Sequence, residues 1–168
     1  MAGSNTSGDA GINAFAQSVE LALVQAYAEL ASSGKVATPA AVDATSALAA
    51  HHQEHASALG VLAGSRATTT PNRRLATMLS ARVRSAPDER AALEVALALE
   101  NEAASTYLFA LGSLEATEAL QLAASILPVE SQHAVVLATL LHKAPGETFP
   151  NFETQDQAFR PDEFPAPS

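Results

Sequence analysis

The chain has 168 residues, of which 38 are alanine; it contains no cysteine and no tryptophan, and its formal net charge is −9 at pH 7. The absence of cysteine excludes a disulfide scaffold, a thiolate metal site and a cysteine nucleophile. The acidic balance disfavours a nucleic-acid partner held through its phosphates. Because alanine is the strongest helix former and sheets favour β-branched and aromatic residues, the composition predicts one all-α domain.

The first half of the chain predicts two helices joined by a short connection. Residues 1–9 form an expected flexible lead, and Asp9 is a candidate N-cap for a first helix over about residues 12–30. Thr38 followed by Pro39 predicts the start of a second helix that ends at about residue 63. The lead has neither the charged nor the apolar region of a signal peptide. The compartment stays open between the cytoplasm and export with a signal already removed.

The second half repeats this pattern after a short basic helix predicted over residues 73–84. A third long helix is expected from about residue 88 to 111, and a fourth from about 115 to 142. Four long helices with short connections predict an antiparallel four-helix bundle over residues 10–143. Residues 144–168 hold five of the nine prolines and four of the six phenylalanines, which favours an extended tail packed on the bundle. No apolar run reaches the roughly 18 residues that cross a membrane.

Two glutamates lie in apolar surroundings on the first and third long helices. Glu20 is flanked by valine and leucine, and Glu100 lies in a similar stretch. Tyr27 and Tyr107 each follow one of these glutamates by seven residues, or two helical turns, so each tyrosine shares a face with its glutamate. The alternatives are surface carboxylates and ordinary core tyrosines with satisfied hydroxyls.

The second and fourth long helices carry paired ligand-type residues. His52 and His55 form one i, i+3 pair and Glu130 and His133 form the other, so each pair presents two groups on one helix face. The spacing repeats, because Glu20 and Glu100 differ by 80 positions and His55 and His133 by 78. At equal depths in two hairpins, these residues are expected to meet near the middle of the bundle.

Two details of this pattern stay open. His51 shares a face with His55 at i, i+4, so either His51 or His52 can face inward. Glu102 lies about 200° around the helix from Glu100, at about 100° per residue, and is expected to face water.

Three carboxylates at the centre of a bundle would repel one another and lose hydration unless cations neutralised them. A mixed set of oxygen and nitrogen ligands without thiolate suits Fe, Mn, Zn or Cu rather than Ca. The sequence therefore predicts a metal site with six ligands: Glu20, His52, His55, Glu100, Glu130 and His133.

This pattern resembles the ferritin-like superfamily, and most closely its small, alanine-rich bacterial members. The strings HHQEHASAL and VESQHAVVL carry the resemblance, which covers about residues 10–143. It implies a ferritin-like four-helix bundle with two divalent transition-metal ions, iron first and Mn, Zn or Cu as alternatives. It further implies O2 or peroxide as reaction partners, in a ferroxidase or a peroxide-reducing oxidoreductase. Tyr27 and Tyr107 would then be catalytic, supplying an electron or orienting a ligand.

One position departs from the family pattern. The glutamate that the family carries on its second helix is His52 here, which leaves three carboxylates against three imidazoles. This departure favours a nitrogen-preferring ion such as Cu or Zn, or one weakly occupied metal position. The alternative function is therefore a non-enzymatic metal-binding or interaction bundle with a redox-silent or empty site. Whether the chain is an enzyme stays open, and the expected assembly is a monomer or homodimer.

Overall fold

A computed structural model describes residues 8–144 and 154–167, and every regular element in these ranges is helical. The all-α prediction is confirmed for this part of the chain. The elements are α1 (Asp9–Ser32), α2 (Pro39–Ala63), the 3₁₀ turn η1 (Gly64–Arg66), α3 (Arg73–Ser85), α4 (Glu89–Leu111) and α5 (Thr117–Leu140).

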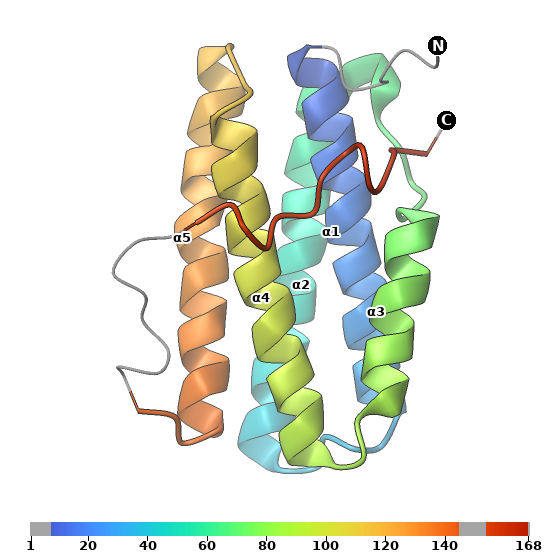
Figure 1. The fold of residues 1–168 in the computed structure, drawn as a ribbon, viewed down its shortest axis with the longest axis vertical. Helices are drawn as coiled ribbons and strands as arrows, with labels where there is room; N and C mark the ends of the chain where they lie inside the picture. The colour runs from blue at the N-terminus through green and yellow to red at the C-terminus, as the bar shows by residue number, and fades with distance from the viewer. Residues whose placement is uncertain (1–7, 145–153, 168) are drawn as a thin grey trace.

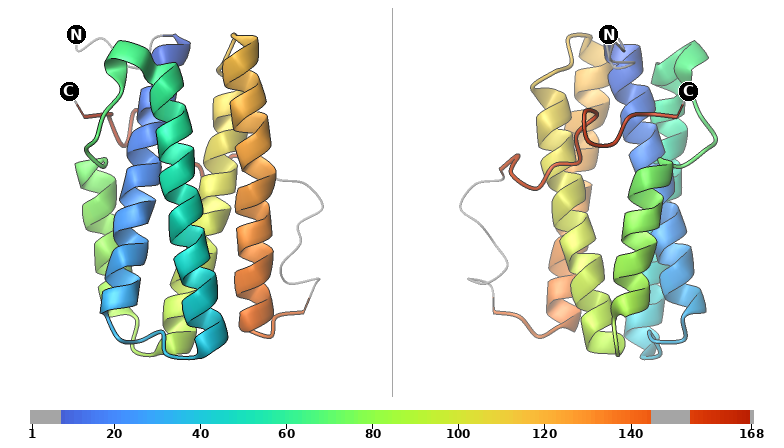
Figure 2. Two further views of the ribbon diagram at one scale, coloured as in Figure 1. Left: turned by 180° about the vertical axis from the view of Figure 1, so that it is seen from behind. Right: turned by 45° about the vertical axis from the view of Figure 1, so that its right-hand side comes forward.

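The four long helices lie side by side with their axes roughly aligned, and the shorter α3 lies along α1 (Figure 1). α1 packs mainly against α2, and α4 mainly against α5. Seen from behind, α2 and α5 are neighbours as well (Figure 2). Each of the four helices therefore presents one face to a common interior.

Side chains at the helix ends fix how the hairpins begin. Asn72 and Asp88 cap α3 and α4, accepting from the backbone N–H groups of Leu75 and Ala91 at 3.1 and 2.9 Å. The prediction that Asp9 caps the first helix was wrong, because α1 already begins at Asp9 after Gly8, whose φ is 81°. The Asp9 carboxylate instead accepts from the backbone N–H groups at residues 115 and 116, at 3.0 and 2.6 Å, and holds the α4–α5 connection.

Small side chains let the helices come close together. Alanines fill much of the interior between fully buried larger residues such as Phe15, Leu23 and Leu99. At Gly60 on α2, a Cβ atom would lie 2.4 Å from Nε2 of Gln17 on α1. The α1–α2 pair therefore has no room for a larger side chain at this point unless Gln17 moves.

Residues 154–167 run across the bundle as a segment without helix or strand, with turns at residues 156–157 and 161–163 (Figure 1). Phe159 and Phe164 are buried in the core, with ring centroids 5.7 Å apart in an edge-to-face arrangement. The N–H of Phe159 donates to the Thr106 hydroxyl at 2.8 Å, and the Asn72 amide donates to the carbonyl of Phe164 at 3.0 Å. The other two tail phenylalanines, at positions 149 and 152, lie outside the described residues.

Within the described ranges, α5 is the one helix whose length and apolar composition would suffice to cross a membrane. The core helices of folded domains meet the same criterion. About 39% of this apolar stretch of α5 is buried in the bundle, and Glu130 and His133 on the same helix are buried as well.

Candidate metal centre

The six residues predicted as ligands converge at the middle of the bundle from all four long helices. Five of them are at most 4% exposed, and the His55 side chain is 13% exposed. Ionisable groups this deeply buried need opposite charges or hydrogen bonds around them. They come from α1 (Glu20), α2 (His52, His55), α4 (Glu100) and α5 (Glu130, His133).

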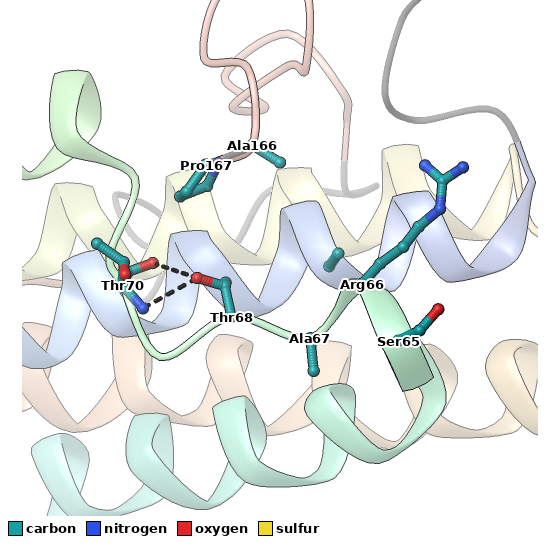
Figure 3. Close-up of a pocket in the computed structure, with 8 residues that line it drawn as sticks. Ser65, Arg66, Ala67, Thr68, Thr70, Ala166 and Pro167 are labelled. Atoms are coloured by element: carbon teal, nitrogen blue, oxygen red, sulfur yellow. Dashed lines mark hydrogen bonds between the residues drawn. The ribbon is translucent and has the colours of Figure 1, made fainter.

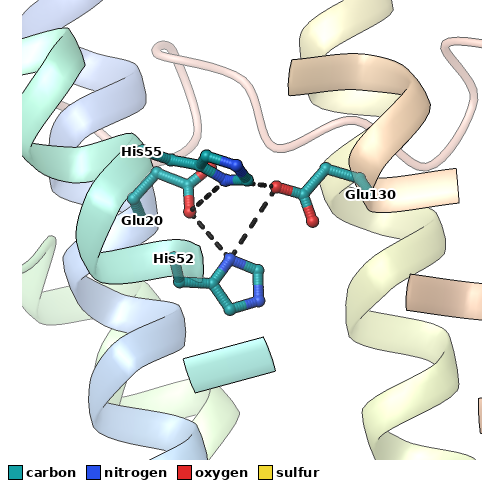
Figure 4. A group of neighbouring side chains, drawn as sticks. All are labelled: Glu20, His52, His55 and Glu130. Atoms are coloured by element: carbon teal, nitrogen blue, oxygen red, sulfur yellow. Dashed lines mark hydrogen bonds and ion pairs between the residues drawn. The ribbon is translucent and has the colours of Figure 1, made fainter. Parts of the chain in front are cut away.

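One group of donors joins α1, α2 and α5, and it is drawn in Figure 4. It consists of Glu20, His52, His55 and Glu130, and its ligand atoms all lie within 4.8 Å of one another. Oε2 of Glu20 lies 2.8 Å from Nδ1 of His52 and 3.8 Å from Nδ1 of His55. Oε1 of Glu130 closes the group at 2.9 Å from Nδ1 of His55. We call these four residues the first donor group.

The second donor group joins α2, α4 and α5. It consists of His52, Glu100, Glu130 and His133, again with ligand atoms within 4.8 Å of one another. Nε2 of His52 lies 3.2 Å from Oε1 of Glu100. Nδ1 of His133 lies 3.0 Å from Oε2 of Glu100 and 3.1 Å from Oε2 of Glu130. Each group thus offers two carboxylates and two imidazoles.

The two groups share His52 and Glu130, and each shared residue divides its atoms between them. Glu130 turns Oε1 toward His55 and Oε2 toward His133. His52 turns Nδ1 toward Glu20 and Nε2 toward Glu100. The cluster therefore has two halves related by the repeat of the two helical hairpins, with Glu130 and His52 between them.

Both tyrosines predicted beside the cluster donate to its carboxylates, but each bonds the glutamate of the other helix. The Tyr107 hydroxyl on α4 donates to Oε1 of Glu20 on α1 at 2.5 Å, and the Tyr27 hydroxyl on α1 donates to Oε1 of Glu100 on α4. Both hydroxyls are buried. The crossed bonds tie α1 to α4 through the centre of the bundle.

The buried charges shift one another's ionisation. Burial by itself would raise the pKa of Glu20, but the charge and the hydrogen bond of His52, together with the nearby His55, lower it to about 2. The pKa of Glu100 is likewise lowered against the effect of burial, chiefly by His52 and His133. Burial opposes protonation of His55, yet the carboxylates of Glu130 and Glu20 raise its pKa to about 9. The pKa of Glu130 is raised, first by burial and then by the charge of Glu20.

The open choice between His51 and His52 is decided by the packing of α2. His52 is fully buried in the cluster, whereas His51 is exposed. His51 nevertheless reaches α5, where its Nδ1 lies 2.8 Å from Nε2 of His133. The i, i+4 spacing puts His51 and His55 on one face of α2, but the contact of His51 with α5 is set by tertiary packing.

The donor set fits a metal ion on the evidence of two buried atoms. Nδ1 of His55 and Oε1 of Glu130 are 2.9 Å apart, yet neither atom forms a hydrogen bond with good geometry among the described residues. Ligands at 2.0–2.2 Å around a tetrahedral ion lie about 3.4 Å from one another. The separations of 2.8 to 3.8 Å between donor atoms bracket this value. These residues could hold a metal ion between them.

Glu102, expected to face water, is only 19% exposed and forms two hydrogen bonds, of 2.9 and 2.7 Å, with Arg82.

A pocket of about 290 Å³ lies between the η1 turn and the tail (Figure 3). Small and hydroxyl side chains such as Ser65, Thr68 and Thr70 line most of it. It contains none of the six predicted ligands, so the buried cluster is the candidate functional site.

A comparison with known protein families shows to which family the chain belongs. Residues 8–143 match the ferritin-like domain. The chain belongs to this family. The match covers the four long helices and both donor groups, as the sequence resemblance implied. No curated protein and no solved structure gave a significant match.

Proposed function

We propose that this ferritin-like protein is an antiparallel four-helix bundle that binds two divalent transition-metal ions, one in each donor group. The main support for the proposal is the orientation of the Glu130 carboxylate, which turns one oxygen toward His55 and the other toward His133. A carboxylate placed in this way can serve two ions at once. The unsatisfied atoms of His55 and Glu130 and the membership of the family support the same conclusion.

Different residues of the cluster would have different roles in such a site. Glu20 and His55 would complete the first ion's ligands, and Glu100 and His133 the second ion's, while His52, which as a neutral imidazole presents one lone pair, would serve one of the two ions. The hydroxyls of Tyr27 and Tyr107 hold the two outer carboxylates in place, and the buried surroundings exclude bulk water. Bound iron would supply the electrons and the open ligand positions that O2 or peroxide chemistry needs.

On this basis we propose oxidation of Fe(II) or reduction of peroxide as the reaction, with Tyr27 and Tyr107 orienting the outer carboxylates. An additional role as electron donors would place both tyrosines in the catalytic machinery. Their position supports this, because each hydroxyl touches a proposed ligand directly.

A second function is favoured by the charge balance of the cluster. Three imidazoles face three carboxylates, and the pKa values of His52, His55 and His133 are raised against burial by their carboxylate neighbours. Protonated histidines can thus neutralise the glutamates without a metal. His52 also replaces a carboxylate of the family pattern. Both features favour a bundle with a redox-silent ion such as Zn, or an empty site that serves an interaction.

Elemental analysis of protein purified without chelator tests metal binding first. About two ions per chain supports the proposal, and substoichiometric metal that Glu130→Ala does not reduce contradicts it. Glu102→Gln is the matched control, because this glutamate is paired with Arg82 outside the cluster. Anaerobic loading with Fe(II) followed by O2 then separates the two functions. A ferric absorption band supports the oxidase, and loaded protein without such a band supports the redox-silent alternative.

A further inference from the structure

His51 lies outside the two donor groups and yet contacts one of their imidazoles. Its side chain is exposed on α2, and its Nδ1 atom lies 2.8 Å from Nε2 of the buried His133 on α5. The two rings are nearly parallel, with centroids 5.1 Å apart and planes inclined by 22°. The residue next to it, His52, points into the cluster. His52 is therefore part of the cluster, whereas His51 lies outside it and contacts one of its residues, His133.

The His133 ring is consequently held at both nitrogens. Its Nδ1 atom faces Oε2 of Glu100 and Oε2 of Glu130, at 3.0 and 3.1 Å. A ring nitrogen that binds a metal must present its lone pair, so the ring proton has to sit on the other nitrogen. A hydrogen-bond acceptor beside that other nitrogen fixes both the tautomer and the ring plane. For His133, the acceptor in this position is Nδ1 of His51.

We propose that His51 is a positioning residue for the metal centre: it accepts the Nε2–H of His133 and thereby directs Nδ1 of His133 at the second donor group. This inference rests on the proposed function, since it assigns His133 as a ligand. It extends the site by one residue, which links the buried cluster to the protein surface. His51 itself donates no ligand to either donor group.

Zinc binding to the metal-free protein tests the proposal. Partners of metal-bound histidines contribute about 10- to 100-fold in metal affinity. We expect His51→Ala to weaken zinc binding at the second donor group by this factor. His51→Asn should restore most of it, because the Asn side-chain oxygen can occupy the place of Nδ1. His142→Ala, which removes an imidazole that follows α5, should leave the affinity unchanged.

A second measurement does not depend on metal. Nitrogen-15 NMR of the metal-free protein should show a slowly exchanging Nε2–H proton on His133. It should be lost in His51→Ala and retained in His51→Asn. Unchanged zinc affinity in His51→Ala overturns the proposal, and so does an equal loss in the Ala and Asn variants. If the unmodified protein binds no zinc or iron, the proposed function fails. The exchange of the His133 proton then decides alone whether His51 positions the ring.

Discussion

The hydroxyl of Tyr107 on α4 donates a hydrogen bond to Oε1 of Glu20 on α1 across 2.5 Å, and these residues are 87 positions apart in the chain. The Tyr27 hydroxyl makes the reverse connection, from α1 to Glu100 on α4. The two hairpins are therefore joined through their tyrosines and proposed ligands, and each hairpin steadies a carboxylate of the other.

Removal of the Tyr107 hydroxyl should weaken both the fold and the site. Tyr107→Phe leaves the buried Glu20 carboxylate without this donor, which costs about 1–3 kcal/mol of the free energy of unfolding. Urea unfolding of the metal-free protein measures this loss. Tyr27→Phe should show a similar loss because its bond is the counterpart. A stability equal to that of the unmodified protein in both variants would show that neither hydroxyl is needed to satisfy its carboxylate.

The division of Glu130 between the donor groups predicts unequal effects of ligand substitutions. Glu130→Ala removes an oxygen from both groups, so both ions should be lost. Glu20→Ala removes a ligand from the first group alone and should leave the second ion bound. Elemental analysis after dialysis against metal-free buffer distinguishes these results. If Glu20→Ala and Glu130→Ala lose the same amount of metal, the two groups are not separate.

The pKa shifts predict that the metal-free protein is most stable in mildly acidic solution. The pKa of Glu20 is lowered from 4.5 to about 2, so its stabilising contribution is present above 4.5 and is lost as the pH falls through about 2. The pKa of His55 is raised from 6.5 to about 9, so its contribution is present below 6.5 and is lost as the pH rises through about 9. The pKa of Glu130 is raised above 4.5, so its contribution is present below 4.5 and is lost as the pH rises through the raised value, which moves the maximum of stability toward lower pH.

Urea unfolding at a series of pH values checks this profile. We expect the free energy of unfolding to be highest between about pH 4.5 and 6.5 and to fall on both sides. His55→Gln should reduce the alkaline loss, since it removes the titrating imidazole. A stability that rises steadily from pH 6.5 to 9 would contradict the predicted charge state of the histidines.

Bound metal should stabilise the folded protein and move the pH of its maximum stability upward. Ligand at a free concentration of 100 times Kd adds about 2.7 kcal/mol to the free energy of unfolding. Zinc should therefore raise the melting temperature, and EDTA should reverse the rise. Because protons compete with metal for histidine and carboxylate, the effect should shrink as the pH falls below about 9, the pKa of His55 in the metal-free protein. An equal rise in Glu130→Ala would place the bound zinc elsewhere.

The burial of Phe159 predicts that the tail contributes to the free energy of unfolding. Its ring is buried in the core, and its backbone N–H is bonded to Thr106 on α4. Phe159→Ala should lower the free energy of unfolding by about 3–5 kcal/mol. Thermal unfolding monitored by circular dichroism measures the change, with the exposed Val61→Ala as the control. A loss no larger than that of Val61→Ala would mean that the tail adds little to the core.

Most of the helical content could be predicted from local signals. Pro39 at the start of α2 and Gly64 at its end mark the bounds that the structure has. Asp9 shows the limit of such signals. Its carboxylate is suited to cap a helix, but it accepts hydrogen bonds from the backbone of the α4–α5 connection instead. A local sequence pattern does not reveal such a distant partner.

The sequence by itself determined which residues could form the cluster, because the spacings of seven and three residues put Glu20 with Tyr27, and Glu130 with His133, on single helix faces. Only the tertiary structure decided how these faces combine. The crossing of the tyrosine bonds and the division of Glu130 between two donor groups depend on how the helices are rotated about their axes. So does the position of His51 against His133. Helical periodicity is a local property of the chain, whereas the rotation of one helix against another is set by the packing of the whole core.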